Sequence, residues 1–530
     1  MKPVYFKPWI KDWEWGVRIA LFLILLSSLM QLGLFAMTQQ YIVAYLGSQP
    51  EDVWFCLMST YAGIISILPV QFRFLRYFEV RSYLAFNIML AMLLNCLCLF
   101  CQDITLLFLI RFLQGLVLGS LIVSVLILIF SRVPVERAPL IGAAVLYPTI
   151  LSNIVVAGLF AGFVVESANW EVIYYYLIGI QLLMLIMTLL MLRRHTGHRR
   201  FPLYQIDWAG FILLACSALS LAYTFIYGSK FYWFADPRIR VSATIAGISI
   251  PLFLYRQHIV KRKLIHPGVF KSVHFVTALC LLAVYYGTKD SINLVYNYAS
   301  GVLRWSPFQV GLLGVCNIAA MACLTVFSAR AMIAGKYPVR FFLVTGFSLL
   351  AMFNIWMWLV LTPDLSYTDL LLPVLLQGAA SGILFVPIMI YILKAAPGFS
   401  GTSGIVLAAC TRFFVTLNSL AGLYNLQLYF NQYFKEGFLG YMTIENQNVT
   451  GRLNAYRSLY VAKGFSAEQG SGLANGAIWQ NLLQQSQLLT NRAVFMTFAI
   501  ILMVTMVLCL VVPAVRETLQ HRRKRLLVKQ

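Results

Sequence analysis

Asp290 is the one acidic residue, of 18 in the chain, that lies well inside a long apolar stretch, and Lys289 precedes it. Charged groups in hydrocarbon are costly, so ionisable residues found there are candidates for function. Four residues share one helix face at i, i+4, i+7 and i+11, namely Tyr286, Asp290, Asn293 and Asn297. We expect this face to line a central cavity, where Asp290 binds and releases a proton or meets a cationic substrate. In the alternative interpretation, Lys289 only neutralises Asp290 or extends to the membrane interface.

Two deep arginines and several amides are further candidates. Arg111 and Arg412 keep their charge, so they need acceptors such as carbonyl groups, water or a carboxylate. Amides contact varied ligands without the cost of burying a charge, and we include four in the expected substrate cavity: Gln31, Gln39, Gln114 and Gln377. The alternative for both kinds of residue is structural, with the arginines bracing helices and the amides joining them.

Motifs for enzymatic chemistry are missing from the sequence. There is no GxxxxGK[ST] phosphate-binding loop, no nucleophile triad and no metal-ligand cluster among the six scattered histidines and ten cysteines. The cysteines lie in or at the edges of apolar stretches, where they are expected to pack as small apolar side chains. We therefore expect a protein that is not an enzyme and uses no cofactor, with its energy coming from an ion gradient or the substrate's own gradient.

The elements that carry these residues are long apolar segments. The chain is 61% hydrophobic and 11% charged, with a mean hydropathy of +0.80. A membrane crossing needs about 20 apolar residues. Fourteen segments qualify, at roughly 17–46, 53–72, 82–101, 105–130, 139–165, 171–192, 207–227, 240–258, 273–302, 307–330, 339–361, 369–394, 402–430 and 492–515. The sequence thus predicts an all-α integral membrane protein with about fourteen transmembrane helices.

The net charge of +22 comes from basic residues that are distributed unequally between the two sides of the predicted topology. With fourteen spans, most of the 40 Lys and Arg residues fall on the side of both termini, including Lys261, Arg262 and Lys263 in one loop. This distribution places both termini in the cytoplasm by the positive-inside rule. We therefore expect a multi-pass protein of a bacterial inner membrane, with the lipid bilayer rather than nucleic acid as the partner of the basic residues. The first apolar stretch is too long for a cleaved signal peptide and is expected to remain as a helix.

Two segments about half the chain apart repeat the string Leu-Gln-Gly with a second glycine four residues after the first. The glycines are Gly115 and Gly119 in the fourth span, and Gly378 and Gly382 in the twelfth. Small residues four apart form a strip along which helix backbones approach closely. The repeat indicates two homologous helix bundles in one chain.

With these motifs, the chain resembles the major facilitator superfamily, and specifically its fourteen-helix drug:proton antiporter branch. Arg111, Gln114, Gly115 and Gly119 match the fourth-helix motif, in which Arg is followed by Gln-Gly and a further small residue. Gly158 and Gly162 match the antiporter motif of the fifth helix, where they are expected to pack helices. The other similar segments are 158–176, 207–228, 266–275 and 397–414.

The resemblance implies a fold and a mechanism. The expected layout is an N-terminal six-helix bundle (1–200), two additional helices with a linker (201–265) and a C-terminal six-helix bundle (266–530). A protein with this layout is expected to export amphipathic organic compounds by alternating access and proton antiport. In this family the residue at Arg111 is associated with proton coupling, a role we also expect for Asp290.

Two departures from the family pattern leave other functions open. Thr38 stands where the branch usually has an acidic residue, and the fifth helix lacks its Gly-Pro core. An uncoupled or dedicated exporter of a metabolite, lipid or siderophore therefore remains an alternative, as does a membrane receptor or scaffold that no longer transports. The outer loop 431–491 is expected to form a helical hairpin that caps the outer mouth or meets a periplasmic adaptor protein, or else a partly ordered loop.

Overall fold

The computed structural model describes residues 5–11, 13–132, 142, 145–146, 149–150, 152–153, 156–158, 160–161, 171–194, 202–334, 337–396, 401–443 and 445–512. The first half contains α1 (Pro8–Lys11), α2 (Glu14–Met37), α3 (Gln39–Leu46), α4 (Pro50–Tyr77), α5 (Val80–Leu99), α6 (Ile104–Ser131) and α8 (Val172–Met191), followed by α9 (Trp208–Tyr227) and α10 (Pro237–Ile259). The second half contains α11 (Val273–Lys289), α12 (Ile292–Gly301), α13 (Pro307–Ile333), α14 (Val339–Val360), α15 (Tyr367–Ala395), α16 (Gly401–Leu417), α17 (Leu423–Tyr441), α18 (Gln447–Ala462) and α19 (Ala467–Val511).

The expected all-α membrane fold is confirmed. Within the described ranges there is no β-strand, only an isolated bridge between Phe6 and Leu192. Eleven of the described helices are long and apolar enough to cross a membrane. The expected spans 273–302 and 402–430 correspond to α11 with α12 and to α16 with α17, and the expected span 139–165 lies largely outside the described residues.

Three expected spans are not single helices. The first is divided at Thr38, and the thirteenth passes through a π-helical turn at Asn418–Gly422. The ninth was expected to be one helix carrying a continuous polar stripe, and this is wrong, because α11 ends at Lys289 and α12 begins at Ile292. Asp290 and Ser291 occupy the break, consistent with the tendency of Asp and Ser side chains to compete for backbone hydrogen bonds.

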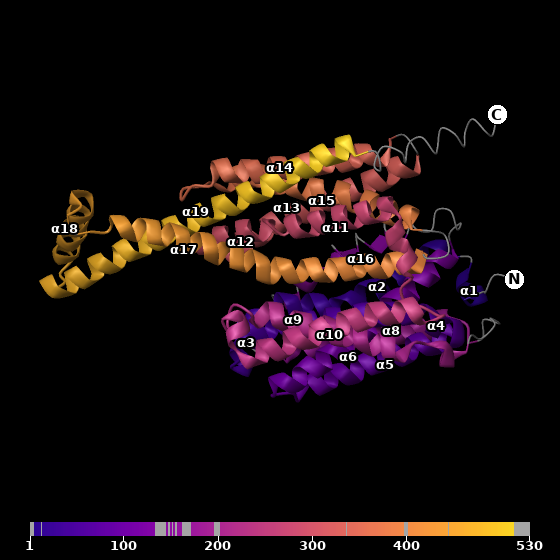
Figure 1. Cartoon of the computed structure of the whole chain (residues 1–530). Coiled ribbons are helices and arrows are strands. Elements are labelled where there is room, and N and C mark those ends of the chain that lie inside the picture. Colours follow the sequence, from indigo (N-terminus) through magenta and orange to yellow (C-terminus); the bar gives the residue numbers. More distant parts are fainter. Residues whose placement is uncertain are drawn as a thin grey trace.

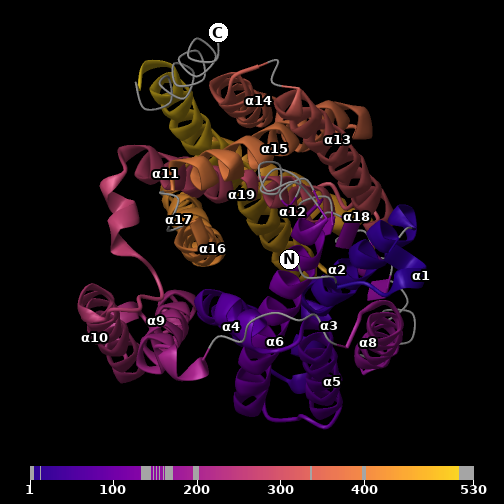
Figure 2. The ribbon, with the colours of Figure 1, turned by 90° about the vertical axis from the view of Figure 1, so that its right-hand side faces the viewer.

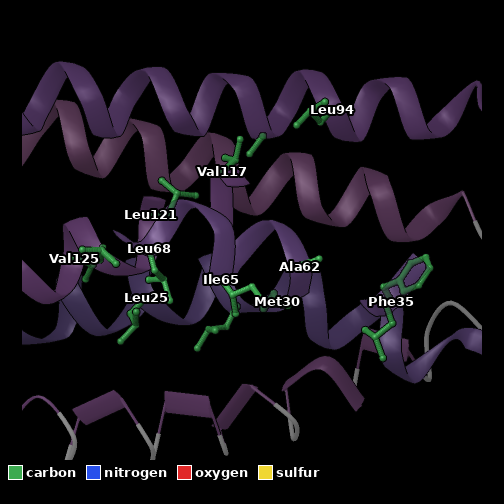
Figure 3. Packing of buried hydrophobic residues seen from close by; sticks show 14 of the residues in the cluster. Leu25, Met30, Phe35, Ala62, Ile65, Leu68, Leu94, Val117, Leu121 and Val125 are labelled. Carbon is green, nitrogen blue, oxygen red and sulfur yellow. The ribbon is translucent and has the colours of Figure 1, made fainter. Parts of the chain in front are cut away.

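Two hydrophobic clusters organise the molecule, one for each bundle in Figures 1 and 2. The first joins residues of α2, α4, α5, α6 and α8, including Leu25, Ile65, Leu68, Leu121 and Val125 (Figure 3). The second joins α11 to α15 and α19. One helix of the second half, α16, contributes Val406, Cys410, Phe413 and Leu417 to the first cluster. The predicted domain boundaries at 200 and 265 stay predictions.

The repeated glycines lie where helix backbones meet. A Cβ at Gly115 would lie 2.1 Å from the carbonyl oxygen of Thr60 on α4, and a Cβ at Gly378 would lie 2.3 Å from that of Asn317 on α13. Added Cβ atoms at Gly119 and Gly382 would also come within 2.5 Å of α4 and α13, respectively. α6 therefore packs on α4 as α15 packs on α13.

Gly158 differs from these glycines. No heavy atom lies within 4 Å of a Cβ built at Gly158, so the close helix approach expected there is absent among the described residues. Gly162 lies outside the described residues.

The two additional helices form a pair at the edge of the first bundle (Figure 2). Hydroxyl groups join α9 to α10, with oxygen–oxygen distances of 2.9 Å between Ser217 and Ser249 and 3.0 Å between Thr224 and Ser242. At the other end of the pair, the Arg256 guanidinium of α10 lies 2.7 Å from the carboxylate of Asp207. The end of α10 is therefore fixed to the start of α9.

The described residues of the outer segment 431–491 are helical except for two short connections, 442–446 and 463–466, so the partly ordered loop is wrong. It includes the end of α17, α18 and the start of α19, which has 45 residues. Ser486 Oγ donates to the carbonyl oxygen of Asn431 at 3.1 Å, and Asn481 Nδ2 donates to Tyr456 Oη at 3.0 Å. Figure 1 shows the hairpin projecting away from the bundles with α18 at its tip, rather than folding over them as a cap.

Candidate functional site

Asp290 lies at the break between α11 and α12, where donors from two elements reach its carboxylate. Lys289 Nζ donates to Asp290 Oδ1, and the two side chains are each 25% exposed. Ser419 Oγ, from the π-helical turn, donates to Asp290 Oδ2 at 3.1 Å. Charge-assisted hydrogen bonds of this kind are stronger than neutral ones. The carboxylate thus connects the break in α11–α12 to the turn between α16 and α17.

A side chain of α15 donates a hydrogen bond to the backbone carbonyl group that the helix break leaves free. In a continuous helix the carbonyl group of Lys289 would accept from the N–H of Asn293, which instead donates to Asp290 O at 3.0 Å. Gln377 Nε2 donates to the Lys289 carbonyl oxygen at 2.7 Å, and Gln377 Oε1 accepts from Asn317 at 2.7 Å. Interrupted helices near the bilayer midplane, with freed backbone groups, are a feature of ion and substrate sites in transporters.

Aromatic rings and cations extend this cluster across the junction of the bundles. The Arg412 guanidinium carbon on α16 lies 5.2 Å from the ring centroid of Tyr286 and 5.8 Å from that of Tyr61. Lys289 Nζ lies 5.4 Å from the Tyr286 ring. These distances are within the range of cation–π attraction. Because Tyr61 belongs to α4 and Tyr286 to α11, Arg412 contacts both halves of the molecule.

A second polar network is buried within the first bundle. Arg111 Nη1 donates to Gln114 Oε1 at 2.7 Å, and Gln114 Nε2 donates to Asn95 Oδ1 at 2.9 Å. Asn95 donates to Gln181 at 2.9 Å and accepts from Gln31 at 3.4 Å. Four helices, α2, α5, α6 and α8, thus share one chain of side-chain hydrogen bonds.

Arg111 is buried in this network with only part of its guanidinium group hydrogen-bonded among the described residues. Its side chain is 1% exposed, and the ring of Phe35 lies 3.7 Å from its guanidinium carbon. Its Nε and Nη2 atoms have no hydrogen-bond partner among the described residues. Buried donors without acceptors are expensive, so such a group is a candidate for a functional role.

The structure separates the predicted site residues into two groups. Tyr286, Lys289, Asp290, Gln377 and Arg412 come together at the junction of the bundles. Arg111, Gln114 and Gln31 belong to the buried network in the first bundle, where Gln31 and Gln114 are at most 2% exposed. The remaining predicted residues are on other elements: Gln39 is partly buried on α3, and Asn293 and Asn297 are exposed on α12 beyond the break.

Other members of the two groups were not predicted. Asn95 and Gln181 are amides in apolar helices, so the rule that polar residues in spans are functional candidates would have found them. Tyr61 and Ser419 carry no such signal, because tyrosine and serine are common in spans. Their part depends on helix packing that the sequence does not specify.

The comparisons with known proteins agree with this architecture. The family model described as Major Facilitator Superfamily matches residues 20–417. The chain belongs to the major facilitator superfamily. The match ends at Leu417, the last residue of α16, so the outer hairpin of this superfamily member lies beyond the matched residues.

Its similar relatives in the superfamily are named for drug export. It is 24% identical to the multidrug export protein EmrB of Haemophilus influenzae, over 70% of this chain and 71% of that protein. It is 22% identical to the probable multidrug resistance protein EmrY of Escherichia coli, over 77% and 78%. Multidrug resistance protein 3 of Bacillus subtilis is 26% identical over 51% of this chain, and the match spans 52% of that relative's length. These relatives support the predicted resemblance to the drug-efflux branch.

Two solved transporter structures share the fold. A POT family transporter in complex with a thioalcohol-conjugated peptide aligns with a TM-score of 0.57 and 12% identity, over 92% of this chain and 95% of that one. The human organic anion transporter MFSD10 aligns with a TM-score of 0.51 and 12% identity, over 93% and 98%. At these identities the likeness concerns the fold alone.

Replacing Arg111 with methionine is expected to leave thermal stability unchanged or higher. Exchanging a buried charge for an apolar side chain of similar volume is often neutral or stabilising, and two donors of Arg111 lack partners. By contrast, Gln114→Leu removes the acceptor of the guanidinium and is expected to cost about 1–3 kcal/mol. Thermal unfolding of both purified variants tests this contrast. A methionine variant less stable than Gln114→Leu would show that Arg111 is primarily a structural brace.

Proposed function

We propose that this protein is a secondary active transporter that exports amphipathic organic compounds in exchange for protons. The observation that carries the proposal is the Asp290 carboxylate, which lies within the spanning region and remains 25% exposed. A group that must take up and release a proton needs such partial access, together with neighbours that respond to its charge. Lys289 and Ser419 are those neighbours.

Protonation of Asp290 would weaken the contact between the α11–α12 break and the π-helical turn. The ionised carboxylate attracts Lys289 and accepts from Ser419; a neutral carboxyl group loses most of the attraction. The connection between the α11–α12 break and the π-helical turn then weakens. Because α16 packs both on α4 of the first bundle and on α11 of the second, this step would change the contact between the two bundles. Alternating access by rocking of two bundles requires such a link.

Aromatic groups contributed by both halves of the molecule supply surfaces for an amphipathic substrate. Tyr61 and Tyr286 flank Arg412, and the rings of Trp54 and Tyr424 meet edge to face with centroids 6.1 Å apart. Flat apolar rings with hydroxyl groups contact many compounds by packing, with few specific hydrogen bonds. The names of the multidrug relatives agree with a substrate class of this breadth.

Reconstitution of the purified protein in liposomes with an imposed pH gradient tests the proposal. Flux of a fluorescent amphipathic dye that follows the gradient and moves protons in the opposite direction is the expected result. Dye flux that ignores the pH gradient would instead support the uncoupled or dedicated exporter. Absence of flux for dyes, metabolites and lipids alike would support the receptor or scaffold.

We propose a bacterial inner membrane as the location, with both termini cytoplasmic. The basic residues on the side of the termini support this orientation. The hairpin of α17, α18 and α19 would then project into the periplasm and meet an adaptor protein (Figure 1).

Removing the tip of the hairpin, residues 447–462, is expected to leave dye transport in liposomes intact but to lower drug resistance in cells. The tip packs on α19 and not on the bundles, so the transport path is undisturbed. Replacement of α18 by a short Gly-Ser linker, with the intact protein as control, is measured in both assays. Full resistance of cells that carry the shortened protein would exclude an essential adaptor at this tip.

A further inference from the structure

A groove of about 620 Å³ opens between the two additional helices. Its lining on α9 is Cys216, Leu219, Ser220 and Tyr223, and its lining on α10 is Pro237, Arg238, Val241, Ser242 and Ile245. Both sets follow the i, i+3, i+4, i+7 spacing of a single helix face. The volume is in the usual range for small-molecule sites, about 300–1,000 Å³. This groove is separate from the Asp290 cluster, because no lining residue belongs to the elements of that cluster.

The floor of the groove is apolar although it contains two serines. Ser220 Oγ donates to the carbonyl oxygen of Cys216 at 2.6 Å, and Ser242 Oγ donates to that of Ser220 at 2.8 Å. Both hydroxyl groups are therefore directed to backbone atoms and hold the helix pair together. The walls are hydrocarbon, and Val241 and Ile245 on the rim are 60% and 46% exposed. A ligand in this groove would contact almost only apolar atoms along its length.

The mouth of the groove is basic. Arg238 lines it at the first turn of α10, and its guanidinium carbon lies 5.4 Å from the ring of Phe231. Lys230 Nζ lies 5.3 Å from the same ring, and Arg240 is exposed two residues after Arg238. Two acids lie nearby. Asp236 caps α10 by accepting from the backbone N–H of Arg238 at 2.7 Å, and Asp52 accepts from Tyr227, whose ring lies 5.5 Å from Lys230 Nζ. Three cations and two carboxylates leave a net positive charge at this end.

The depth of the groove matches one leaflet of a bilayer. From Cys216 to Tyr223 the α9 lining rises about 10 Å at 1.5 Å per residue. The mouth is at the turn between α9 and α10, on the face opposite the termini, and the groove runs from there toward the middle of the helices. Half of the hydrocarbon core is about 15 Å thick. The apolar part therefore has the position of an acyl chain, and Arg238 has the position of a headgroup contact.

We propose that this groove binds one anionic phospholipid of the leaflet at the α9–α10 turn. An acyl chain lies along the apolar walls, and the phosphate is attracted by Arg238 and Lys230. The observations that decide for a lipid over a soluble ligand are the exposed hydrocarbon rim and the predominantly apolar lining of the groove. The charge at the mouth decides for an anionic headgroup over a zwitterionic one.

Native mass spectrometry of the purified protein tests the proposal, with phosphatidylglycerol and phosphatidylethanolamine of identical acyl chains as probes. The intact protein is expected to prefer phosphatidylglycerol. Arg238→Gln should lower its affinity for phosphatidylglycerol about fivefold and leave that for phosphatidylethanolamine unchanged, as expected for one basic residue near a headgroup. Val241→Trp fills the groove and should lower binding of both lipids.

Leu254→Trp is the matched control, since Leu254 is 53% exposed on the same helix and does not line the groove. This variant should bind both lipids as the intact protein does. Unchanged phosphatidylglycerol affinity of Arg238→Gln would overturn the anionic headgroup, and unchanged lipid binding of Val241→Trp would overturn the site. Loss of dye transport in Val241→Trp with lipid binding unchanged would identify a transported compound as the occupant and would also overturn the proposal.

Discussion

The variant Asp290→Asn is expected to abolish proton-driven flux in liposomes. Asparagine has nearly the same shape and accepts from Ser419, but it does not bind and release a proton at physiological pH. The flux that remains should no longer respond to an imposed pH gradient. Dye movement and proton movement are recorded together in the same vesicles, so loss of coupling is distinguished from loss of transport.

Two further variants separate coupling from folding. In Asp290→Asn alone, Lys289 keeps a charge without its carboxylate, and breaking a buried ion pair costs about 3–5 kcal/mol, less for a pair that is 25% exposed. The double variant Lys289→Gln with Asp290→Asn removes this unpaired charge and should recover stability without recovering proton coupling. Asp364→Asn, at an exposed acid between α14 and α15, is the control and should transport normally. Normal pH-dependent flux in Asp290→Asn would remove this carboxylate from the mechanism.

The variant Gly115→Ala is expected to destabilise the protein by about 1–3 kcal/mol, in the range of overpacked cores. A Cβ there would lie 2.1 Å from the Thr60 carbonyl oxygen, and backbone atoms cannot turn away as a flexible side chain can. α6 and α4 must therefore separate along their contact. Gly378→Ala should have a comparable effect, because its Cβ would meet Asn317 O at 2.3 Å.

Gly179→Ala is the matched control for helix propensity. Gly179 lies in α8 with no heavy atom within 4 Å of a built Cβ, so alanine should stabilise the helix by up to about 1 kcal/mol. Thermal unfolding in detergent and the yield of monodisperse protein are compared for the three variants. Equal stability of Gly115→Ala and Gly179→Ala would show that the α4–α6 contact relaxes easily.

The helices could be predicted because hydropathy over about 20 residues reports membrane crossing directly. Interruptions within spans could not, since Asp290 and Ser291 lower helix propensity only slightly and a single helix through them would also cross the bilayer. The break depends on Gln377, which accommodates the freed carbonyl group of Lys289 from another helix. Such long-range contacts have no counterpart in the local sequence.

The sequence indicates the charged residues of the candidate site as candidates, but not the residues that lie beside them. Ionisable residues within apolar stretches, such as Asp290 and Arg111, are rare enough to be noticed singly. Ser419 and Tyr61 became candidates only when packing placed them beside Asp290 and Arg412. The expected grouping of Asn293 and Asn297 with Asp290 assumed an unbroken helix, and the break separates them.

The length of α19 has a mechanical consequence. This helix runs without interruption from the second bundle to the tip of the hairpin, and its first 25 residues or so extend about 37 Å beyond the predicted span 492–515. If α19 moves as a rigid body, a tilt of about 10° at the membrane would displace the tip of the hairpin by roughly 6 Å over this projecting length. Small rearrangements inside the bilayer would thus be magnified outside it, and a pair of spectroscopic labels on α18 and the α9–α10 turn would report them.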